Sequence, residues 1–289
     1  MNDLVRMKTV AIIGAGEMGA AVGRRMRAMG ARVLTTLNGR GAASAERVRR
    51  AGLEVIGDDD RLIREAGFVL SIVPPGQVHA VAERFLRPLH AVSEKPVFAD
   101  CNAVSPATVR HLATTLAVTG CRFVDAGIIG GPPSDDGAKG PRFYASGEYA
   151  QELARLRNYG IDVAVLDAPV GAASALKLSY AGITKGLIAM GAAMIGAAER
   201  EGLSLALQKE LERSQPHLLA WLGFGVPNLS RKAYRWVAEM DEIASFIGET
   251  GAGGGIYAEV ARLFEHVARE RERNGDEAFA KLNAFVKPR

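Results

Sequence analysis

The feature that most constrains the fold is a glycine-rich segment near the start of the chain, TVAIIGAGEMGAAVGRRMRAMG. An apolar run from Val10 to Ile13 precedes three spaced glycines, and helix-favouring residues follow. In this G-x-G-x-x-G spacing the first glycine makes a tight turn, the second lets the backbone approach a pyrophosphate, and the third lets helix and strand pack closely. The first N–H groups of such a helix bind phosphate. We therefore predict a dinucleotide site at Gly14, Gly16, Glu17, Met18 and Gly19.

The end of the next predicted strand, ARVLTTLNGR, indicates which dinucleotide is bound. Sites that prefer NAD usually carry Asp or Glu about 20 residues after the glycines, where it binds the ribose hydroxyls. Asn38 and Arg40 stand in that neighbourhood, and no acidic residue does. A guanidinium binds a 2′-phosphate through two hydrogen bonds. We predict NADP in preference to NAD; the alternative is that Arg40 only points into water from a loop.

Further β-rich runs alternate with helical patterns over the next hundred or so residues. This alternation predicts an α/β fold with a mostly parallel, doubly wound sheet. Ligands in such sheets lie beyond the carboxyl ends of the strands. The loops 73–77, 102–105 and 127–134 are therefore candidates for the site, with Val73, Pro74 and Asn102 at the cofactor. The segments PRFYASG and IDVAVLDAP add a further pair, either hairpin-like or at the sheet edge.

Strand patterns end at Val170, and helical periodicity takes over. The run ALKLSYAGITKGLIAMGAAMIGAAEREGL predicts one long helix, and further helices are expected over 204–222, 230–248 and 256–275. The sequence thus predicts an NAD(P)-binding Rossmann domain over residues 1–168 and an all-helical domain over 169–289. The long helix is apolar between 178 and 198, but it contains Lys185 and several glycines. We expect it to be buried in the protein rather than in a membrane.

The charge and the cysteines of the chain indicate which binding partners and which cellular compartment to expect. A net charge of +4 does not call for a nucleic-acid partner. Eight arginines and one acidic residue lie between Val22 and Arg50, which is either a solvated helix face or a field that attracts an anion. Two cysteines without a C-x-x-C pair indicate a reducing compartment, and we see no metal-ligand spacing. No signal-peptide pattern opens the chain, so we expect a cytoplasmic protein.

Four segments carry a resemblance to a known family: GAGEMG, CNAVSP, VDAGIIGGP and GAASALKLSYAG. Together they resemble the β-hydroxyacid dehydrogenases, which include 3-hydroxyisobutyrate dehydrogenase, tartronate semialdehyde reductase and the 6-phosphogluconate dehydrogenases. The tail KAYRWVAEMDEIASF resembles a 6-phosphogluconate dehydrogenase-like sub-branch with a divergent C-terminal domain. The resemblance implies a homodimer and an NAD(P)-dependent oxidoreductase that interconverts a small 3-hydroxy acid and its carbonyl form.

The same resemblance implies that Lys177 is the catalytic acid and base. Oxidation of an alcohol needs a hydride acceptor, the nicotinamide, and a base for the hydroxyl proton. A lysine of ordinary pKa, about 10.4, is mostly protonated at pH 7, so burial or a nearby cation has to lower it. The alternative is an ordinary solvated helix lysine. Lys185 lies near the same face, and we expect it to be structural.

Departures from the family pattern concern the substrate. Ile129 stands where the family has a serine, which leaves the N–H groups around Gly130 and Gly131 to bind a substrate carboxylate. Ala181 stands where the family has an asparagine, so we expect Tyr180 or Ser179 to supply a hydroxyl. Arg235 and Lys232 are candidate carboxylate binders in the tail.

Two other functions stay open at this point. An NADPH-dependent imine reductase shares the architecture; Lys177 counts against it, and the missing serine and asparagine count for it. A non-catalytic nucleotide sensor would bind cofactor without turnover. Asp125, near a predicted strand end, is expected to stabilise only its own turn.

Overall fold

The computed structural model describes residues 6–134, 140–248 and 253–287. The chain divides into two compact units, residues 1–177 and 178–289. The division falls inside the helix α8 (Ala172–Arg200) and not between residues 168 and 169, where the sequence predicts it. The physical reason is that the first turns of α8 are bonded to the sheet of the first unit, as described below.

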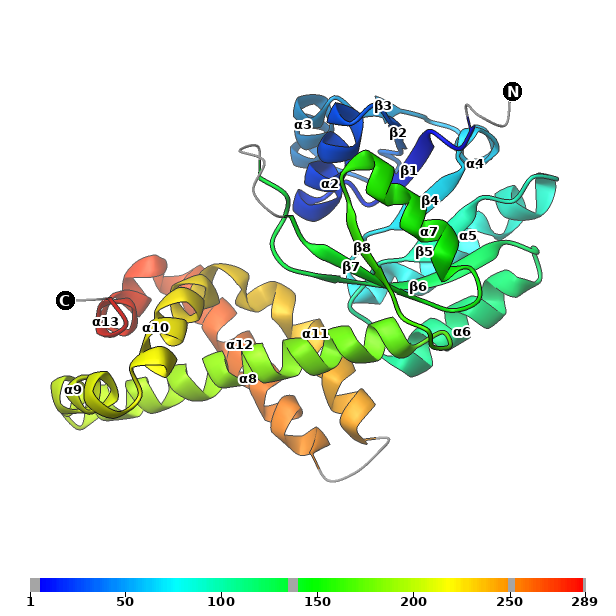
Figure 1. The fold of residues 1–289 in the computed structure, drawn as a ribbon. Helices are drawn as coiled ribbons and strands as arrows, with labels where there is room; N and C mark the ends of the chain where they lie inside the picture. Colours follow the sequence, from blue (N-terminus) through cyan, green and yellow to red (C-terminus); the bar gives the residue numbers. More distant parts are fainter. Residues whose placement is uncertain (1–5, 135–139, 249–252, 288–289) are drawn as a thin grey trace. The chain divides into compact units, whose positions relative to one another are not determined.

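The first unit is built on one eight-stranded sheet with the strand order β3-β2-β1-β4-β5-β6-β7-β8 (Figure 1). All neighbouring strands are parallel except β6 and β7. The predicted doubly wound fold is confirmed. The predicted last pair is β7 and β8, which lies at the sheet edge and is parallel, so it is not a hairpin. The strands are β1 (Thr9–Ile13), β2 (Arg32–Thr35), β3 (Glu54–Val55), β4 (Phe68–Ser71), β5 (Val97–Asp100), β6 (Arg122–Ile129), β7 (Arg142–Ser146) and β8 (Asp162–Val165).

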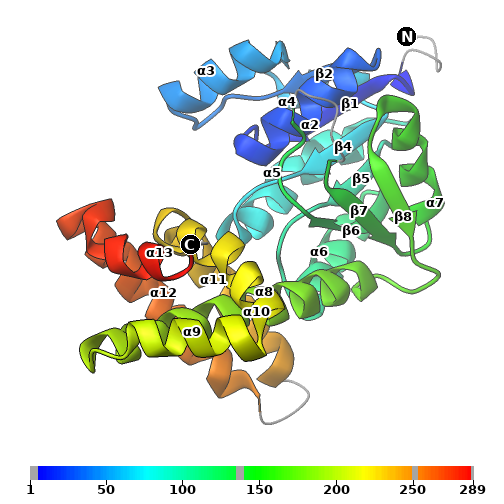
Figure 2. The ribbon, with the colours of Figure 1, turned by 60° about the vertical axis from the view of Figure 1, so that its left-hand side comes forward.

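Helices cover both faces of this sheet, so its central strands β1, β4 and β5 are buried at every position. One face packs against α2 (Glu17–Ala28), α3 (Ala42–Ala51), α7 (Ala150–Leu153) and the 3-10 helix η2 (Ala154–Tyr159). The other packs against α4 (Asp59–Glu65), α5 (Val78–Ala91) and α6 (Pro106–Ala117), with the 3-10 helix η1 (Pro75–Gln77) before α5. Figure 2 shows the sheet from a second direction, with α5 and α7 on opposite sides of the strands. In β1 the side chains alternate, with Val10 and Ile12 in one core and Ala11 and Ile13 in the other.

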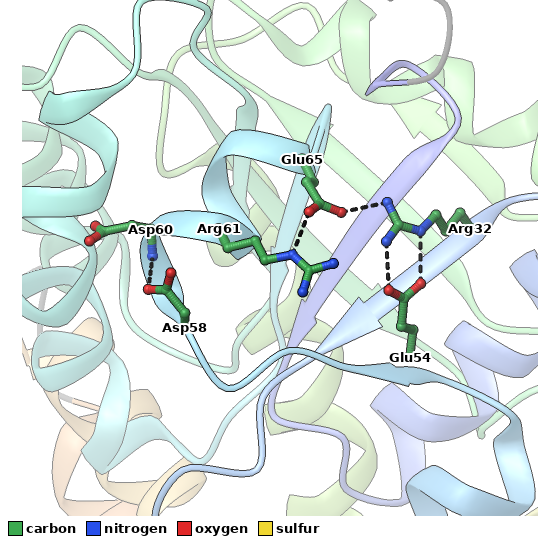
Figure 3. A network of polar contacts seen from close by, with 6 residues as sticks. All are labelled: Arg32, Glu54, Asp58, Asp60, Arg61 and Glu65. Carbon is green, nitrogen blue, oxygen red and sulfur yellow. Dashed lines mark hydrogen bonds and ion pairs between the residues drawn. The ribbon is translucent and has the colours of Figure 1, made fainter. Parts of the chain in front are cut away.

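A network of charged residues joins β2, β3 and α4 near the start of β2 (Figure 3). The Arg32 guanidinium donates two hydrogen bonds to the Glu54 carboxylate, at 2.8 and 2.6 Å, and one to Glu65 at 2.6 Å. Arg61 donates to the other oxygen of Glu65 at 2.7 Å. The hydrogen bond from Arg61 is the main cause that lowers the pKa of Glu65, although burial opposes it. Because these groups are partly exposed, each pair stabilises the fold by about 1 kcal/mol or less.

The second unit contains helices throughout its described residues. The predicted helix 204–222 is wrong as one element: it is two helices, and the second begins at Pro216. Proline has no N–H to donate and its ring disfavours the interior of a helix, but it fits the first turn. The elements after α8 are α9 (Ser204–Ser214), α10 (Pro216–Gly225), η3 (Val226–Asn228), α11 (Leu229–Gly248), α12 (Gly254–Asn274), η4 (Asp276–Phe279) and α13 (Ala280–Phe285).

Apolar side chains from α8, α10, α11 and α12 form the core of this unit. Within it, Lys185 of α8 forms an ion pair with Glu239 of α11, and its nitrogen lies 5.4 Å from the centre of the Trp236 ring. Lys185 therefore has the structural role expected for it. By length and composition alone α8 could cross a membrane; 39% of its most apolar window is buried in the protein.

Candidate functional site

The turn after β1 has the geometry that a bound dinucleotide requires. Gly14 has φ +92°, and a Cβ there would lie 2.3 Å from the Ile72 carbonyl oxygen. A Cβ at Gly19 would lie 2.4 Å from the Gly14 carbonyl oxygen. By contrast, no atom lies within 4 Å of a Cβ built on Gly16, the N-cap residue of α2. The chain is thus packed tightly beneath the turn and open above the start of α2, where a phosphate would lie.

A cavity of about 170 Å³ adjoins this turn. Two arginines, Arg40 and Arg47, bring positive charge to its wall. Arg40 also donates to Gln77 at 3.1 Å, and Arg47 donates to Ser44 at 3.1 Å. Sequence reasoning did not single out Arg47, although it belongs to the arginine-rich stretch before residue 50. The lining residues are Gly14, Ala15, Gly16, Thr36, Leu37, Arg40, Ser44, Arg47, Ile72 and Pro74.

The other residues predicted at the cofactor lie around this cavity but do not line it. The exposed Asn38 donates its side-chain amide to the Gly57 carbonyl at 3.2 Å. Glu17 is exposed in the first turn of α2, and Met18 packs against the core. Val73 is buried and donates its N–H to Asn102 at 2.6 Å. Contact of these residues with a cofactor stays a prediction.

Three polar residues form a row across the middle of the sheet. Ser71 of β4, Asp100 of β5 and Asp125 of β6 are paired in register, and their relative exposures are 1%, 2% and 0%. Neighbours in register point to the same face of a sheet, so the two carboxyl groups are close together. Asn102 ties the row together, since its amide donates to Asp100 at 2.6 Å and to Ser71 at 3.0 Å.

Asp125 anchors the start of α8 to the sheet. One of its oxygens accepts hydrogen bonds from the N–H groups of Gly171 at 2.8 Å and Ser174 at 3.1 Å, and from the Ser146 hydroxyl at 2.9 Å. The other accepts from the Ser174 hydroxyl at 2.7 Å. A carboxylate here satisfies N–H groups that have no partner within the helix and interacts favourably with the helix dipole. The prediction that Asp125 stabilises only its own turn is therefore wrong.

Lys177 lies one turn further along α8, over β6. The backbone permits this because residue 127 is glycine: a Cβ at Gly127 would lie 2.8 Å from the Ala173 carbonyl oxygen and 3.1 Å from Lys177 Cβ. The half-buried Lys177 thus starts directly above the strand that carries Asp125.

Burial, hydrogen bonding and two nearby charged groups shift the pKa of Asp100. Burial raises the pKa of Asp100 to about 7, the hydrogen bond from Asn102 opposes the rise, Asp125 adds to it, and Lys177 lowers it. Burial also raises the pKa of the neighbouring Cys101 thiol. Asp100, at the carboxyl end of β5, can therefore take up a proton at a pH closer to neutral than an ordinary carboxyl. Asp100 was not among the predicted site residues, since its role depends on neighbours from other strands.

The residues predicted to bind substrate divide between the two units. Ile129 is the half-buried last residue of β6, so the predicted loop 127–134 begins as strand. Gly130 has φ +119°, and Gly131 is exposed with no atom within 4 Å of a built Cβ. Tyr180 on α8 and Arg235 on α11 are exposed and belong to the second unit. Their contact with substrate stays a prediction.

The described residues contain no group of three or more His, Cys, Asp or Glu side chains that could hold a metal ion. Both cysteines, Cys101 and Cys121, are free and buried. The charged groups that the structure brings together near the end of β5 are Lys177, Asp100 and Asp125.

A doubly wound sheet, an open glycine turn and an arginine-lined cavity beside it define a nucleotide-binding protein of the Rossmann class. Residues 9–158 match the family model described as the NAD binding domain of 6-phosphogluconate dehydrogenase. Residues 198–267 match a domain of unknown function, DUF1932. The chain belongs to the family of the NAD binding domain of 6-phosphogluconate dehydrogenase, and its C-terminal domain is the divergent one that the tail indicates. The resemblance found in the sequence is confirmed.

Individual relatives are similar over most of the chain. An uncharacterized 28.5 kDa protein of Methanothermus fervidus is 26% identical over 206 residues, which are 71% of this chain and 77% of that protein. A conserved protein of unknown function, described as structurally similar to 3-hydroxyacid dehydrogenases, is 28% identical with a TM-score of 0.68. That likeness covers 92% of this chain and 98% of the other.

Two more distant structures share the fold. The 3-hydroxyisobutyrate dehydrogenase of Mycobacterium tuberculosis, solved with L-serine, has a TM-score of 0.67 at 19% identity and covers 90% of this chain and 99% of its own. A reductive aminase of Aspergillus terreus, solved with NADPH and ethyl-5-oxohexanoate, has a TM-score of 0.57 at 21% identity and covers 92% and 94%. Family and fold together support an NAD(P)-dependent oxidoreductase.

Proposed function

We propose that this protein is an NADP-preferring oxidoreductase that interconverts a small 3-hydroxy acid and its carbonyl form, with Lys177 as the general acid and base. The observation that carries the proposal is the position of Lys177, on helix α8, directly over the sheet. It lies over β6, and its charge acts on Asp100, the last residue of β5. The row of Ser71, Asp100 and Asp125 continues to Ile13, which directly precedes the glycine turn. Cofactor cradle and lysine thus share one edge of one sheet, where ligands of such folds bind.

The chemistry assigned to each group follows from this arrangement. A bound nicotinamide would supply or accept the hydride at the substrate carbon. In reduction the Lys177 ammonium donates a proton to the developing alkoxide oxygen; in oxidation the neutral amine takes the proton from the hydroxyl. We assign the binding of a substrate carboxylate to the N–H groups of Gly130 and Gly131, two exposed residues, since the serine of the family pattern is replaced by Ile129.

The preference for NADP rests on the cavity beside the glycine turn. Arg40 and Arg47 supply two guanidinium groups there, and the hydroxyls of Thr36 and Ser44 supply further donors. A 2′-phosphate would gain charge-assisted hydrogen bonds from these groups, whereas the uncharged ribose of NAD would not.

The test measures turnover of a panel of 3-hydroxy acids with NADP and with NAD. Nicotinamide absorbance is recorded for the wild type, Lys177→Ala and Lys209→Ala. Lys209 is an exposed lysine on α9 and serves as a matched control. The proposal predicts turnover with NADP on at least one acid, lost in Lys177→Ala with cofactor binding retained. Turnover that Lys177→Ala leaves unchanged would overturn the role of the lysine.

Reduction of a C=N bond is the second candidate. Ile129 and Ala181 stand where hydroxyacid dehydrogenases carry serine and asparagine, and a reductive aminase shares the fold. The two functions are distinguished by supplying NADPH with a ketone, with and without an amine. Consumption that requires the amine would favour this candidate, and tight cofactor binding without turnover on any acid or imine would favour a nucleotide sensor.

We also propose that the protein is a homodimer, because α8 presents an apolar row to solvent. The row repeats at alternating spacings of three and four residues, the pattern of helices that pair with one another. A charge in its middle, Ile183→Lys, should convert dimer to monomer in sedimentation; an unchanged sedimentation coefficient would contradict the proposal. The row consists of Tyr180, Ile183, Leu187, Met190 and Met194, which are 37–64% exposed.

A further inference from the structure

The buried carboxyl of Asp100 has a structural setting that cofactor binding and the acid and base role of Lys177 leave unexplained. It has 2% relative exposure and stands next to the completely buried Asp125 in the adjacent strand. Two carboxyl groups side by side in a sheet interior are costly, because burial removes their hydration and like charges repel. Such a pair is stable only when hydrogen-bond donors or a cation interact with the carboxyl groups.

The Asp125 carboxyl is stabilised by hydrogen-bond donors. The N–H groups of Gly171 and Ser174 and the hydroxyls of Ser146 and Ser174 occupy its oxygens. These donors hold the Asp125 carboxyl in place at the start of α8.

Asp100 is placed differently. Within the part of the chain that the structure describes, it accepts hydrogen bonds from the side-chain amide of Asn102 at 2.6 Å and from the Asn102 N–H at 3.4 Å. The charged groups that act on it are Asp125 from β6 and Lys177 from α8, and the polar Ser71 of β4 completes the row. Lys177 is thus the cation available to offset a charge on Asp100.

We propose that Asp100 is a positioning residue for Lys177, and that its buried carboxylate sets the pH range over which Lys177 carries the proton it exchanges with substrate. The inference rests on the proposed role of Lys177 and adds a second group to it. In reduction Lys177 gives its proton to the substrate oxygen and regains one from solvent; Asp100 stabilises the ammonium before the step. The two groups titrate as a coupled pair, so neither has an independent midpoint.

Supporting chemistry comes from the pKa of Asp100 itself. Burial raises it to about 7, while Lys177 lowers it. Coupling is reciprocal, so a carboxylate at Asp100 must stabilise the protonated form of Lys177 by the same amount. Loss of the carboxylate would therefore leave a lysine that releases its proton at lower pH.

The first test does not depend on activity. The full-length protein is labelled with ¹³C at the aspartate carboxyls, and the Asp100 signal is assigned by its loss in Asp100→Asn. We expect the midpoint of that signal to rise by about one pH unit in Lys177→Met, an effect typical of removing an opposite charge nearby. Lys209→Met, on the surface of α9, should leave it in place. A midpoint that Lys177→Met does not move would overturn the inference, whether or not the protein turns over any substrate.

The second test uses the pH profile of kcat/KM on the substrate found above. In Asp100→Asn the limb assigned to Lys177 should move to lower pH by about one unit in both reaction directions. A lower rate with an unmoved profile would mean that Asp100 is only structural. If Asp100→Asn does not fold, the Asp100 signal is assigned by its through-bond correlation to the Cys101 N–H, and the Lys177→Met titration decides. Coupled titration without any turnover would contradict the proposed function while supporting the pair.

Discussion

The glycine turn after β1 and the lysine site at the start of α8 lie along the same sheet, but they are built in opposite ways. The turn comes from one continuous segment, Thr9–Gly19, whose glycines are fixed by contacts within a short stretch and with β4. The lysine site needs side chains from four strands and a helix. A binding platform can thus be encoded locally, whereas proton chemistry in this fold depends on charges brought together from distant segments.

Among the substitutions proposed, we expect Asp125→Asn to lower the stability of the lysine site most. Asp125→Asn places an amide where four donors now converge, so at least one buried N–H loses its acceptor. We expect the free energy of unfolding to fall by about 3–5 kcal/mol. Chemical denaturation measures it. The control is Asp162→Asn, whose carboxylate is half-exposed in an ion pair with Arg142 and should matter by about 1 kcal/mol or less. Equal losses in the two variants would contradict the anchoring role.

The glycine turn allows a paired test within one segment. In Gly14→Ala the new methyl group meets the Ile72 carbonyl oxygen at 2.3 Å in a left-handed backbone, so we expect a loss of roughly 3 kcal/mol in stability. In Gly16→Ala the methyl group meets no protein atom within 4 Å, so stability should stay within about 1 kcal/mol of the wild type. Cofactor affinity, measured by nicotinamide fluorescence, should nevertheless fall about tenfold or more in Gly16→Ala. Unchanged affinity in that variant would place the phosphate elsewhere.

The buried Asp100 predicts an unusual dependence of stability on pH. Its pKa is raised to about 7 in the folded protein, whereas the unfolded chain has an ordinary carboxyl near 3.9. The folded state therefore binds more protons between these values, and its stability decreases as pH rises through this window. Asp100→Asn lacks this loss. We expect its stability relative to the wild type to increase by about 2–4 kcal/mol from pH 4 to pH 8. A constant difference across that range would contradict a buried, raised carboxyl.

A smaller effect should separate the two dinucleotides. Arg47→Ala removes one guanidinium from the cavity beside the turn. We expect affinity for NADP to fall about tenfold, which corresponds to about 1.4 kcal/mol, and affinity for NAD to change little. Titration with both cofactors measures this, and the loss should shrink in high salt. Equal losses for both would mean that Arg47 supports the fold of the cavity and not a 2′-phosphate.

The contrast between the local glycine turn and the lysine site built from distant segments also explains which features could be predicted from the sequence. The glycine spacing and the β-α alternation are short patterns, so the fold class could be predicted from the residues. Lys177 was predicted from the resemblance of its motif to a known family, and its role stays a proposal. Asp100 was not, because its meaning depends on register with Asp125 and on burial, which no local pattern carries. The break at Pro216 was readable from proline chemistry but was hidden by helical periodicity on both sides.

We propose that Lys177 transfers the proton in an NADP-dependent reaction. A single-turnover measurement is the most direct test of this role. Enzyme preloaded with NADPH is mixed with the carbonyl substrate, and NADPH absorbance is followed in the wild type and in Lys177→Met. We predict that the variant binds NADPH with wild-type affinity and oxidises it about 10²–10⁴-fold more slowly, the usual contribution of general acid catalysis. NADPH oxidation at the wild-type rate in Lys177→Met would contradict the role of Lys177 as the proton donor.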